Sequence, residues 1–573
     1  MASCKFITEM NRLRKSSSES IDSIETFDKF KGYMHVVRKA EEDLKALLRK
    51  INASRKKTLI LLCGSAGDGK SHLLSYLKNL DEEHLIDTYI VYNDATESSA
   101  PLKTSVETLS EKLEPYMDDK LESPGRNIIL AINLGVLSNF IESEYGKAYN
   151  ALKKYVEDAN ILTMHNNNSE FDKDSHFQHI SFSEYNMYSL TENGAHAGYI
   201  EAIMKKIFAS SKDNLFYVSY EESCLLCPLR RKCPVKKNYE YLMEEKKQKY
   251  IAKLLVKAII QDKMILTTRE ILNFIHDILI PSSFSYQKLQ KIIDDTTYLK
   301  EFLKQITPSL LFESIDVTML LSVFRKYDPL LIRSEQTDED AIIYYASSDI
   351  SLKIKEFLDQ SIFGDVICTP EMLEKINGDK TLRSSIYNLI VRVLSIEEGD
   401  IKGETYKNYL KNLYWYNSGN SKKLRPLYEM VEKAVMQWCG SDDDGNLCLD
   451  DSHKEFHLYE KVEFDEEVNN TVFSIETDEL YQFTQIVVTV FRGLSDDKIE
   501  LNIDYSLYEL LDKLNRGYIQ TIEDRNNHAE FISFVGRILN TGTLSKSLSI
   551  LFMDGKKAII SKSTFGYKFK VVK

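Results

Sequence analysis

A glycine-rich run from Gly64 to Ser71 holds the residues best suited to chemistry. Its sequence is Gly-Ser-Ala-Gly-Asp-Gly-Lys-Ser, so four residues separate Gly64 from the triplet Gly69, Lys70 and Ser71. Glycines permit a tight turn whose backbone N–H groups point at an anion, a lysine adds positive charge, and a serine hydroxyl can bind Mg²⁺. The spacing therefore predicts a Walker A phosphate-binding loop for ATP or GTP.

The flanks of this run support the prediction. Residues 58–63 form a short apolar run, which is typical of a strand buried on both faces, and leucines at helical spacing follow the run. A helix that begins there would direct its positive dipole end at the phosphates. The predicted nucleotide-binding residues are Gly64, Ser65, Ala66, Gly67, Asp68, Gly69, Lys70, Ser71 (also the Mg²⁺ ligand), His72 and Asn186.

Hydrolysis of the nucleotide needs catalytic residues in addition to those that bind the phosphates. Hydrolysing proteins of this class end a later strand with an Asp for magnesium and a Glu that orients water. The third expected strand ends in Asn133, an amide, so Asp94 and Glu97 after the second strand are the nearest acids. Asp94 could equally cap a turn. The candidate catalytic residues are Lys70, Asp94, Glu97, Asn133 and Arg269.

Two of these candidates would act as sensors of the γ-phosphate. Asn186 follows the fourth expected strand, where it is either a sensor or a turn residue. Arg269 lies in the first turn of a helix that Thr267 or Thr268 would cap, where a cation opposes the helix dipole. A bound anion would explain that placement, as in ATPases with a helical lid, and an ordinary surface arginine is the alternative.

Three of the eight cysteines cluster, at Cys224, Cys227 and Cys233. Two thiolates separated by two residues chelate metals well, so this spacing suits zinc or an iron–sulfur cluster with a distant fourth ligand. His176 or His179 could supply that ligand, whereas Cys63 should be buried in the sheet. The alternative is a compact turn with reduced thiols, as expected in a reducing cytoplasm.

Charge is unevenly distributed along the chain. The net charge is −13, and residues 441–500 alone carry 17 acidic against 4 basic side chains. Residues 1–60 carry 14 basic against 8 acidic side chains, which a solvated helix face would explain. A basic knuckle around the cysteines is the best candidate for contact with DNA. Its cations are Arg230, Arg231, Lys232, Lys236 and Lys237.

The elements that must position these residues alternate between strands and helices. Strands are expected at residues 58–63, 89–92, 127–132 and 179–182, with helices at 33–52, 102–117, 140–156 and 199–209. This alternation predicts an AAA-like α/β P-loop NTPase domain with a doubly wound parallel sheet. Mostly helical sequence follows to about residue 440, and β-forming segments at 471–475, 486–491, 499–503, 547–553 and 557–561 predict a β-rich C-terminal domain.

These patterns divide the chain into five parts. We expect a flexible segment at 1–32, the NTPase domain at 33–220, a cysteine knuckle with a helical lid at 221–305, a helical domain at 306–440, and an acidic linker with the β-rich domain at 441–573. No apolar run approaches the roughly 18 residues of a membrane helix. The first 31 residues lack the apolar stretch of a secretory signal, so a cytoplasmic location is expected.

Five features together resemble one protein family. They are LCGSAGDGKSH at 62–72, YNDATES at 92–98, ILAINLG at 129–135, TREILNF at 268–274 and the three clustered cysteines. In combination these features are similar to the DptF family of the bacterial DNA phosphorothioation-dependent restriction system. The resemblance runs from about residue 36 to 281 and extends thinly through residues 409–440 to the C-terminus. It implies an antiviral defence role with partner restriction proteins against DNA that lacks backbone sulfur, but no list of catalytic residues.

The expected function is thus an ATPase whose nucleotide state controls assembly or DNA engagement, with homo-oligomerisation left open. A nucleotide-gated scaffold or DNA-binding adaptor without turnover is the first alternative, and the amide at Asn133 favours it. A small-molecule or nucleotide kinase is the second alternative, against which the large C-terminal parts argue. The expected cofactors are ATP and Mg²⁺, with Zn²⁺ or an iron–sulfur cluster at the cysteines.

Overall fold

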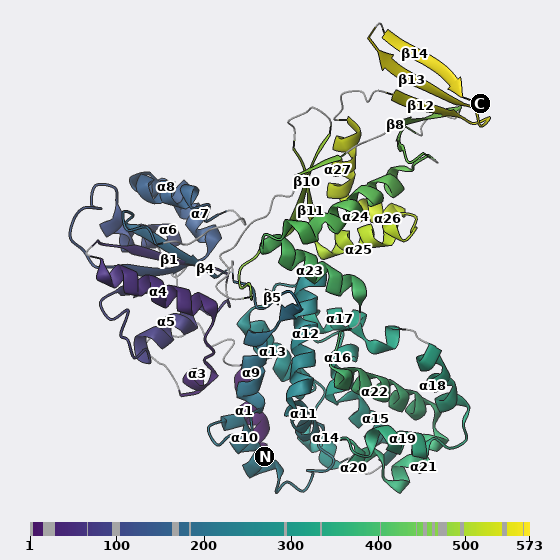
Figure 1. Cartoon of the computed structure of the whole chain (residues 1–573). Coiled ribbons are helices and arrows are strands. Elements are labelled where there is room, and N and C mark those ends of the chain that lie inside the picture. Colours follow the sequence, from purple (N-terminus) through teal and green to yellow (C-terminus); the bar gives the residue numbers. More distant parts are fainter. Residues whose placement is uncertain are drawn as a thin grey trace. The chain divides into compact units, whose positions relative to one another are not determined.

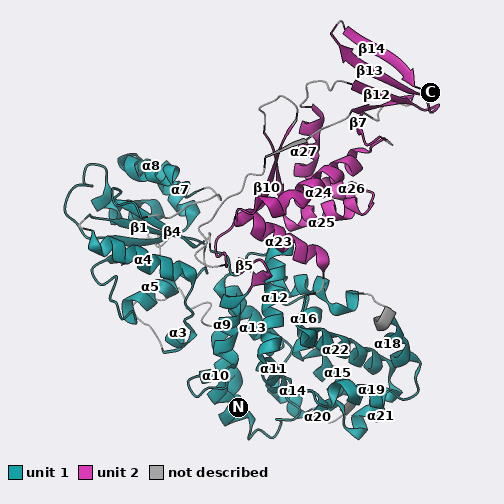
Figure 2. Cartoon of the chain, in the orientation of Figure 1, with its two compact units in different colours: residues 1–188, 197–401 teal, residues 189–196, 402–573 magenta. Residues whose placement is uncertain are grey.

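The chain forms two compact units, residues 1–188 with 197–401 (unit 1) and residues 189–196 with 402–573 (unit 2), as Figure 2 shows. The computed structural model describes residues 4–14, 29–54, 56–65, 67–93, 104–162, 171–182, 185–291, 295–332, 335–401, 403–442, 444–450, 455–460, 464–467, 478–492, 498–540, 547–564 and 566–572. The expected strand at 471–475 lies outside these residues.

Unit 1 contains a four-stranded parallel sheet with the strand order β2-β3-β1-β4 (Figure 1). Its strands are β1 (Leu59–Cys63), β2 (Ile90–Tyr92), β3 (Ile128–Ile132) and β4 (Phe177–Ser181). Every residue of β1, β3 and β4 is buried, as the apolar run at 58–63 predicts for a strand covered on both faces.

Helices cover both faces of this sheet. Leucines of α4 (Lys39–Ala53) and α5 (Lys70–Asn79) pack on one face of β1. Apolar residues of α6 (Ser105–Lys112), α7 (Leu134–Glu142) and α8 (Asn150–Asp158) pack on the other face. The predicted α/β domain with helices on both sides of a parallel sheet is confirmed.

A helical region completes unit 1. Its helices are α9 (Gly198–Phe208), α10 (Leu215–Cys224), α11 (Pro234–Leu242), α12 (Glu245–Gln261), α13 (Thr268–Leu279), α14 (Tyr286–Lys291), α15 (Asp295–Lys304), α16 (Thr307–Glu313), α17 (Met319–Phe324), α18 (Glu335–Ala346), α19 (Ser351–Leu358), α20 (Gly364–Ile367), α21 (Pro370–Gly378) and α22 (Lys380–Glu398). The fully buried Asn238 joins three of them: its amide donates to Leu279 O at 3.0 Å and accepts from Thr307 N at 2.8 Å. This side chain therefore fixes the C-terminal end of α13 against α11 and α16.

Short helices at the N-terminus also belong to unit 1. They are α1 (Lys5–Met10) and α3 (Lys29–Met34). Phe6 of α1 is buried, with its ring edge-on to Tyr239 at 5.1 Å between centroids. Farther along, Arg14 forms an ion pair with the buried Asp277 of α13 at 2.6 Å. Residues 4–14 are thus packed, within a segment whose sequence suggested loose order.

Unit 2 combines helices with antiparallel sheets. Its helices are α23 (Glu404–Asn417), α24 (Ser421–Cys439), α25 (Tyr505–Asn515), α26 (Ile522–Asn527) and α27 (Ala529–Asn540). One sheet has the order β11-β10-β9, and the other β14-β13-β12-β8-β7. The strands are β7 (Leu447–Asp450), β8 (Phe456–Glu460), β9 (Phe464–Glu467), β10 (Ile486–Arg492), β11 (Ile499–Ile503), β12 (Ser547–Phe552), β13 (Lys557–Ser563) and β14 (Gly566–Val572).

A small hairpin from the middle of the chain joins unit 2. It consists of β5 (Ser189–Thr191) and β6 (Gly194–His196). Leu190 is fully buried and exchanges two backbone hydrogen bonds of 2.8 Å with Leu480. The hairpin is therefore part of the folded core of unit 2, although its residues follow β4 directly in sequence.

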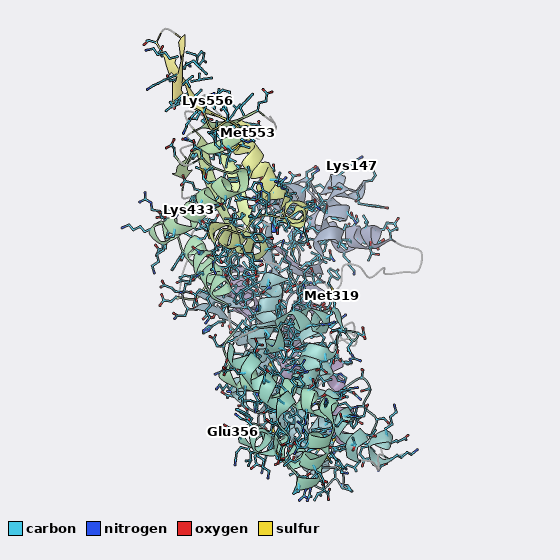
Figure 3. The ribbon with its side chains drawn as sticks, turned by 90° about the vertical axis from the view of Figure 1, so that its right-hand side faces the viewer. Lys147, Met319, Glu356, Lys433, Met553 and Lys556 are labelled. Atoms are coloured by element: carbon cyan, nitrogen blue, oxygen red, sulfur yellow. The ribbon has the colours of Figure 1, made fainter. Side chains whose placement is uncertain are left out.

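The surface of each unit is charged. In unit 1, Lys147 and Glu356 are exposed at the surface, and in unit 2 Lys433 and Lys556 are exposed (Figure 3). None of the helices within the described ranges combines the length and the apolar composition that crossing a bilayer requires.

Candidate functional site

The glycine loop (residues 64–71) begins where β1 leaves the sheet. Cys63, the last residue of β1, is paired in parallel with Ile132 of β3 and with Ser181 of β4. The next residues along these strands, including Asn133 and Phe182, therefore emerge at the same edge. The parallel register thus brings the glycine loop and Asn133 together.

Positive φ angles explain the glycines of this loop. Gly67 and Gly69 have φ values of 90° and 93°, in the left-handed region that residues with a Cβ rarely adopt. At Gly64, which has a φ of 156°, a Cβ would lie 2.8 Å from Asp68 Oδ2 and 3.0 Å from Phe182 Cβ. Glycine is thus required both for the turn and for the close approach of β4.

Polar groups of the loop bind one another. Lys70 Nζ donates to Ser65 O at 2.6 Å, and Ser65 N donates to Asp68 Oδ2 at 2.5 Å. Burial raises the pKa of the Asp68 carboxyl, and the nearby charge of Lys70 partly offsets that rise. The Asp68 carboxylate therefore accepts a hydrogen bond from a backbone N–H group that could otherwise bind a phosphate.

We expect the substitution Asp68→Asn to tighten the binding of ATP or ADP about fivefold or more. Removing one negative charge next to the phosphates relieves repulsion of about 1 kcal/mol even at the dielectric constant of water. Isothermal titration calorimetry checks this change in affinity. Asp87→Asn, at an exposed carboxylate of the same domain, is the matched control. Unchanged or weaker binding in Asp68→Asn alone would contradict the expectation.

Helix α5 carries the end of the glycine loop. Gly69 is its N-cap, so Lys70 and Ser71 form the first turn, where the helix dipole favours anions. His72 follows, and its ring stacks on that of His35 with 3.2 Å between its Nε2 and His35 Nδ1. Burial, more than the nearby His35, lowers the pKa of His72 to about 4, so this ring is neutral at pH 7.

The N-terminus of α13 lies against the glycine loop. A Cβ placed on Gly67 would be 3.2 Å from Thr267 Oγ1, and one placed on Gly69 would be 4.0 Å from Thr268 Oγ1. Thr267 caps α13 in a capping box with Glu270. Arg269 is the next residue after Thr268, so the backbone of this predicted sensor lies beside the loop.

A cavity opens on the α5 side of the glycine loop. Its lining includes Gly69, His72, Phe182, Tyr199 and Arg38. The Arg38 guanidinium lies 5.4 Å from the ring centroid of Phe182 and 4.9 Å from that of Tyr199, and it donates to Asp68 O at 2.8 Å. One arginine thus links the loop backbone to the aromatic wall of the cavity.

Sequence reasoning missed this cavity because it extended one helix over residues 33–52. The structure ends α3 at Met34 and begins α4 at Lys39, and the non-helical residues between them supply His35 and Arg38. That part of the helix prediction is wrong. The only available signal was the pair of β-branched residues Val36 and Val37, which disfavours helix slightly.

The remaining predicted site residues have different outcomes. Ala66, Asp94 and Glu97 lie outside the described residues. Asn133 caps α7, with its Oδ1 accepting from Gly135 N at 2.8 Å. Asn186 is half-buried in the segment after β4 and stays a candidate.

The cysteine cluster lies in a separate cavity of unit 1. Cys224, Cys227 and Cys233 line this cavity, and Cys4 is the fourth thiol in its wall. The two histidines considered as metal ligands form hydrogen bonds away from this cavity. His179 Nδ1 lies 2.8 Å from Tyr155 OH, and His176 Nδ1 lies 2.8 Å from Lys57 O. Neither histidine lines the cavity, and Cys63 is buried in β1.

The basic knuckle is less exposed than its sequence indicates. Lys236 is 9% exposed and pairs with Glu240, while Lys237 is 3% exposed and pairs with Asp365 at 2.7 Å. Arg230, Arg231 and Lys232 stay exposed at the surface. The predicted DNA-contacting surface therefore has three outward cations instead of five.

Comparisons with protein-family models, with curated proteins and with solved structures find no match for this chain. The function must therefore be argued from the site itself.

Proposed function

We propose that this protein is an AAA-like P-loop NTPase that binds ATP with Mg²⁺ and uses the nucleotide to control its engagement with DNA and partner proteins. One observation carries the proposal: a loop with left-handed glycines, Lys70 and Ser71 joins a buried parallel strand to a helix N-terminus. In phosphate-binding loops that arrangement directs backbone N–H groups, a cation and a hydroxyl at a single anion position, which supports the proposal.

The position of α13 supports turnover rather than binding alone. Its capped N-terminus packs on Gly67 and Gly69, so Arg269 belongs to a helix in direct contact with the phosphate loop. Arginines that approach a γ-phosphate stabilise the charge of the transition state. In this proposal Asp94 or Glu97 binds the magnesium ion and orients the attacking water.

One observation favours the scaffold alternative. Asn133 emerges beside the glycine loop, and its side-chain oxygen caps α7. An amide at this position cannot act as a base, so binding without turnover is the second candidate function. Single-turnover assays with radiolabelled ATP separate the two candidates.

In this proposal the nucleobase of ATP enters the cavity beside Gly69. Its wall includes the neutral ring of His72 and two further aromatic rings, Phe182 and Tyr199. Stacking of a base on an aromatic side chain contributes about 1–3 kcal/mol. The cavity adjoins the loop at Asp68 and Gly69, which matches a nucleotide with its phosphates at the loop and its base in the cavity.

We expect His72→Ala to weaken ATP binding about fivefold or more while leaving the affinity for inorganic tripolyphosphate unchanged. The substitution removes a stacking surface but no phosphate contact. Titration calorimetry with both ligands checks this, and His84→Ala, at an exposed histidine, serves as the matched control. Equal losses of affinity for ATP and for tripolyphosphate would contradict the placement of the nucleobase in this cavity.

The restriction role in this proposal is supported by the motif resemblance and by the exposed cations of the knuckle. The decisive assay is ATP turnover without DNA, with unmodified DNA and with phosphorothioated DNA. Stimulation by unmodified DNA alone supports the role. A rate of ATP turnover that neither DNA changes, with or without partner proteins, would contradict the restriction role and leave only the ATPase activity.

A further inference from the structure

Four thiols from two distant parts of the chain line one cavity of unit 1. Three of them, Cys224, Cys227 and Cys233, lie between the end of α10 and the start of α11. The fourth is Cys4, the N-cap of α1, more than 200 residues away in sequence. No described cysteine forms a disulfide.

Packing of α1 holds Cys4 at this cavity. Phe6 lies edge-on to Tyr220 and Tyr239, with ring centroids 6.0 and 5.1 Å apart, and Lys5 forms an ion pair with Glu222. Figure 1 shows α1 beside α10. The fourth thiol is therefore fixed by contacts that are independent of the cysteines.

The backbone around Cys233 is arranged for a thiolate. Cys233 is the N-cap of α11, where the positive end of the helix dipole favours a thiolate. Four cysteines that line one cavity together supply the ligand set of a thiolate-bound metal ion.

We propose that Cys4, Cys224, Cys227 and Cys233 bind one Zn²⁺ ion as a four-thiolate structural site. Zinc favours tetrahedral sulfur ligands with a pair separated by two residues, whereas the five-residue gap before Cys233 matches neither common ferredoxin spacing. Arg230 lines the same cavity, and its positive charge offsets part of the net double negative charge of such a site.

Metal binding requires the thiols to turn inward. Among the described residues no three ligand side chains already converge at coordination distance. Cys227 Sγ lies 3.9 Å from Tyr286 OH, a weak contact that the thiol can leave.

The zinc site would connect the N-terminal segment, residues 4–14, to α13. Beyond α1, Asn11 Oδ1 lies 3.0 Å from His276 Nε2, and Arg14 pairs with Asp277 at 2.6 Å. Both partners belong to α13, whose other end packs on the glycine loop. A metal at Cys4 thus holds in place a segment that braces α13.

Metal analysis of the full-length protein, purified without oxygen, tests the proposal. We expect one zinc per chain in the wild type and in the control Cys439→Ser, a half-buried cysteine of unit 2. Cys224→Ser should lose the metal, and Cys4→Ser should hold it at least about tenfold more weakly in chelator competition. Iron with inorganic sulfide, the absence of any metal, or unchanged affinity in Cys4→Ser would overturn the assignment.

A second measurement uses the wild-type protein and needs no variant to fold. Chelation of the zinc should accelerate hydrogen exchange of the α1 amides at least about tenfold, because α1 loses one of its anchors. Exchange in β10 of unit 2 should stay unchanged. Unaltered protection of α1 after complete removal of zinc would contradict the role of Cys4 as a ligand.

Discussion

Replacing Lys70 with alanine is expected to weaken ATP binding about 10- to 100-fold and to abolish turnover. A charge-assisted hydrogen bond contributes about 1.5–3 kcal/mol, which corresponds to that range of affinity. In the structure Lys70 Nζ donates to Ser65 O at 2.6 Å within the glycine loop, so its ammonium group is already at the proposed phosphate site. Titration calorimetry and single-turnover hydrolysis measure the two effects.

The matched control is Lys78→Ala, because Lys78 is an exposed lysine in the last turn of the same helix. Its affinity and turnover should equal those of the wild type. ATP turnover that survives in Lys70→Ala would show that the glycine loop is not the catalytic site. Equal losses in both variants would indicate damage to α5 and not to phosphate binding.

Replacing Arg269 with alanine is expected to lower kcat about a thousandfold while changing ATP affinity only a few-fold. Arginines that contact the transferred phosphoryl group contribute about 10³–10⁵ in rate, because they act on charge that develops in the transition state. The capping box of Thr267 and Glu270 places Arg269 in the first turn of a helix that packs on Gly67 and Gly69.

Arg325→Ala, at an exposed arginine of the helical region, is the control for removing one positive charge from unit 1. Rapid-quench measurement of kcat, together with calorimetric Kd values, separates chemistry from binding. A loss of affinity as large as the loss of rate would assign Arg269 to ground-state binding. A wild-type rate in Arg269→Ala would show that Arg269 does not act on the transferred phosphoryl group.

Three strands of the α/β domain could be predicted closely because each is a short apolar run, whereas β4 contains Gln178 and His179 and begins two residues before the strand predicted at 179–182. The run at 58–63 became β1, and the strands predicted at 89–92 and 127–132 became β2 and β3 within one residue. Helix boundaries were harder to predict. The break at residues 35–38 carries no proline or glycine, so apart from the weak signal of Val36 and Val37 it is marked by tertiary contacts of Arg38 with Phe182 and Tyr199.

The turn of the glycine loop was likewise predictable from the sequence, because it depends on consecutive residues. The cavity beside it was not, since Arg38, Phe182, Tyr199 and Thr268 come from four separate segments. Cys4 was missed for the same reason. Its approach to the clustered cysteines depends on the burial of Phe6, which no local pattern reveals.

The hairpin of residues 189–196 has a consequence for dissecting the molecule. The chain enters unit 2 at residue 189, returns to unit 1 at 197 and enters unit 2 again at 402. A single cut near residue 401 therefore cannot release unit 1 intact, because β5 would lose its pairing with Leu480 and expose the fully buried Leu190. The two units are interlaced along the chain, and clean separation requires replacing the hairpin with a short linker.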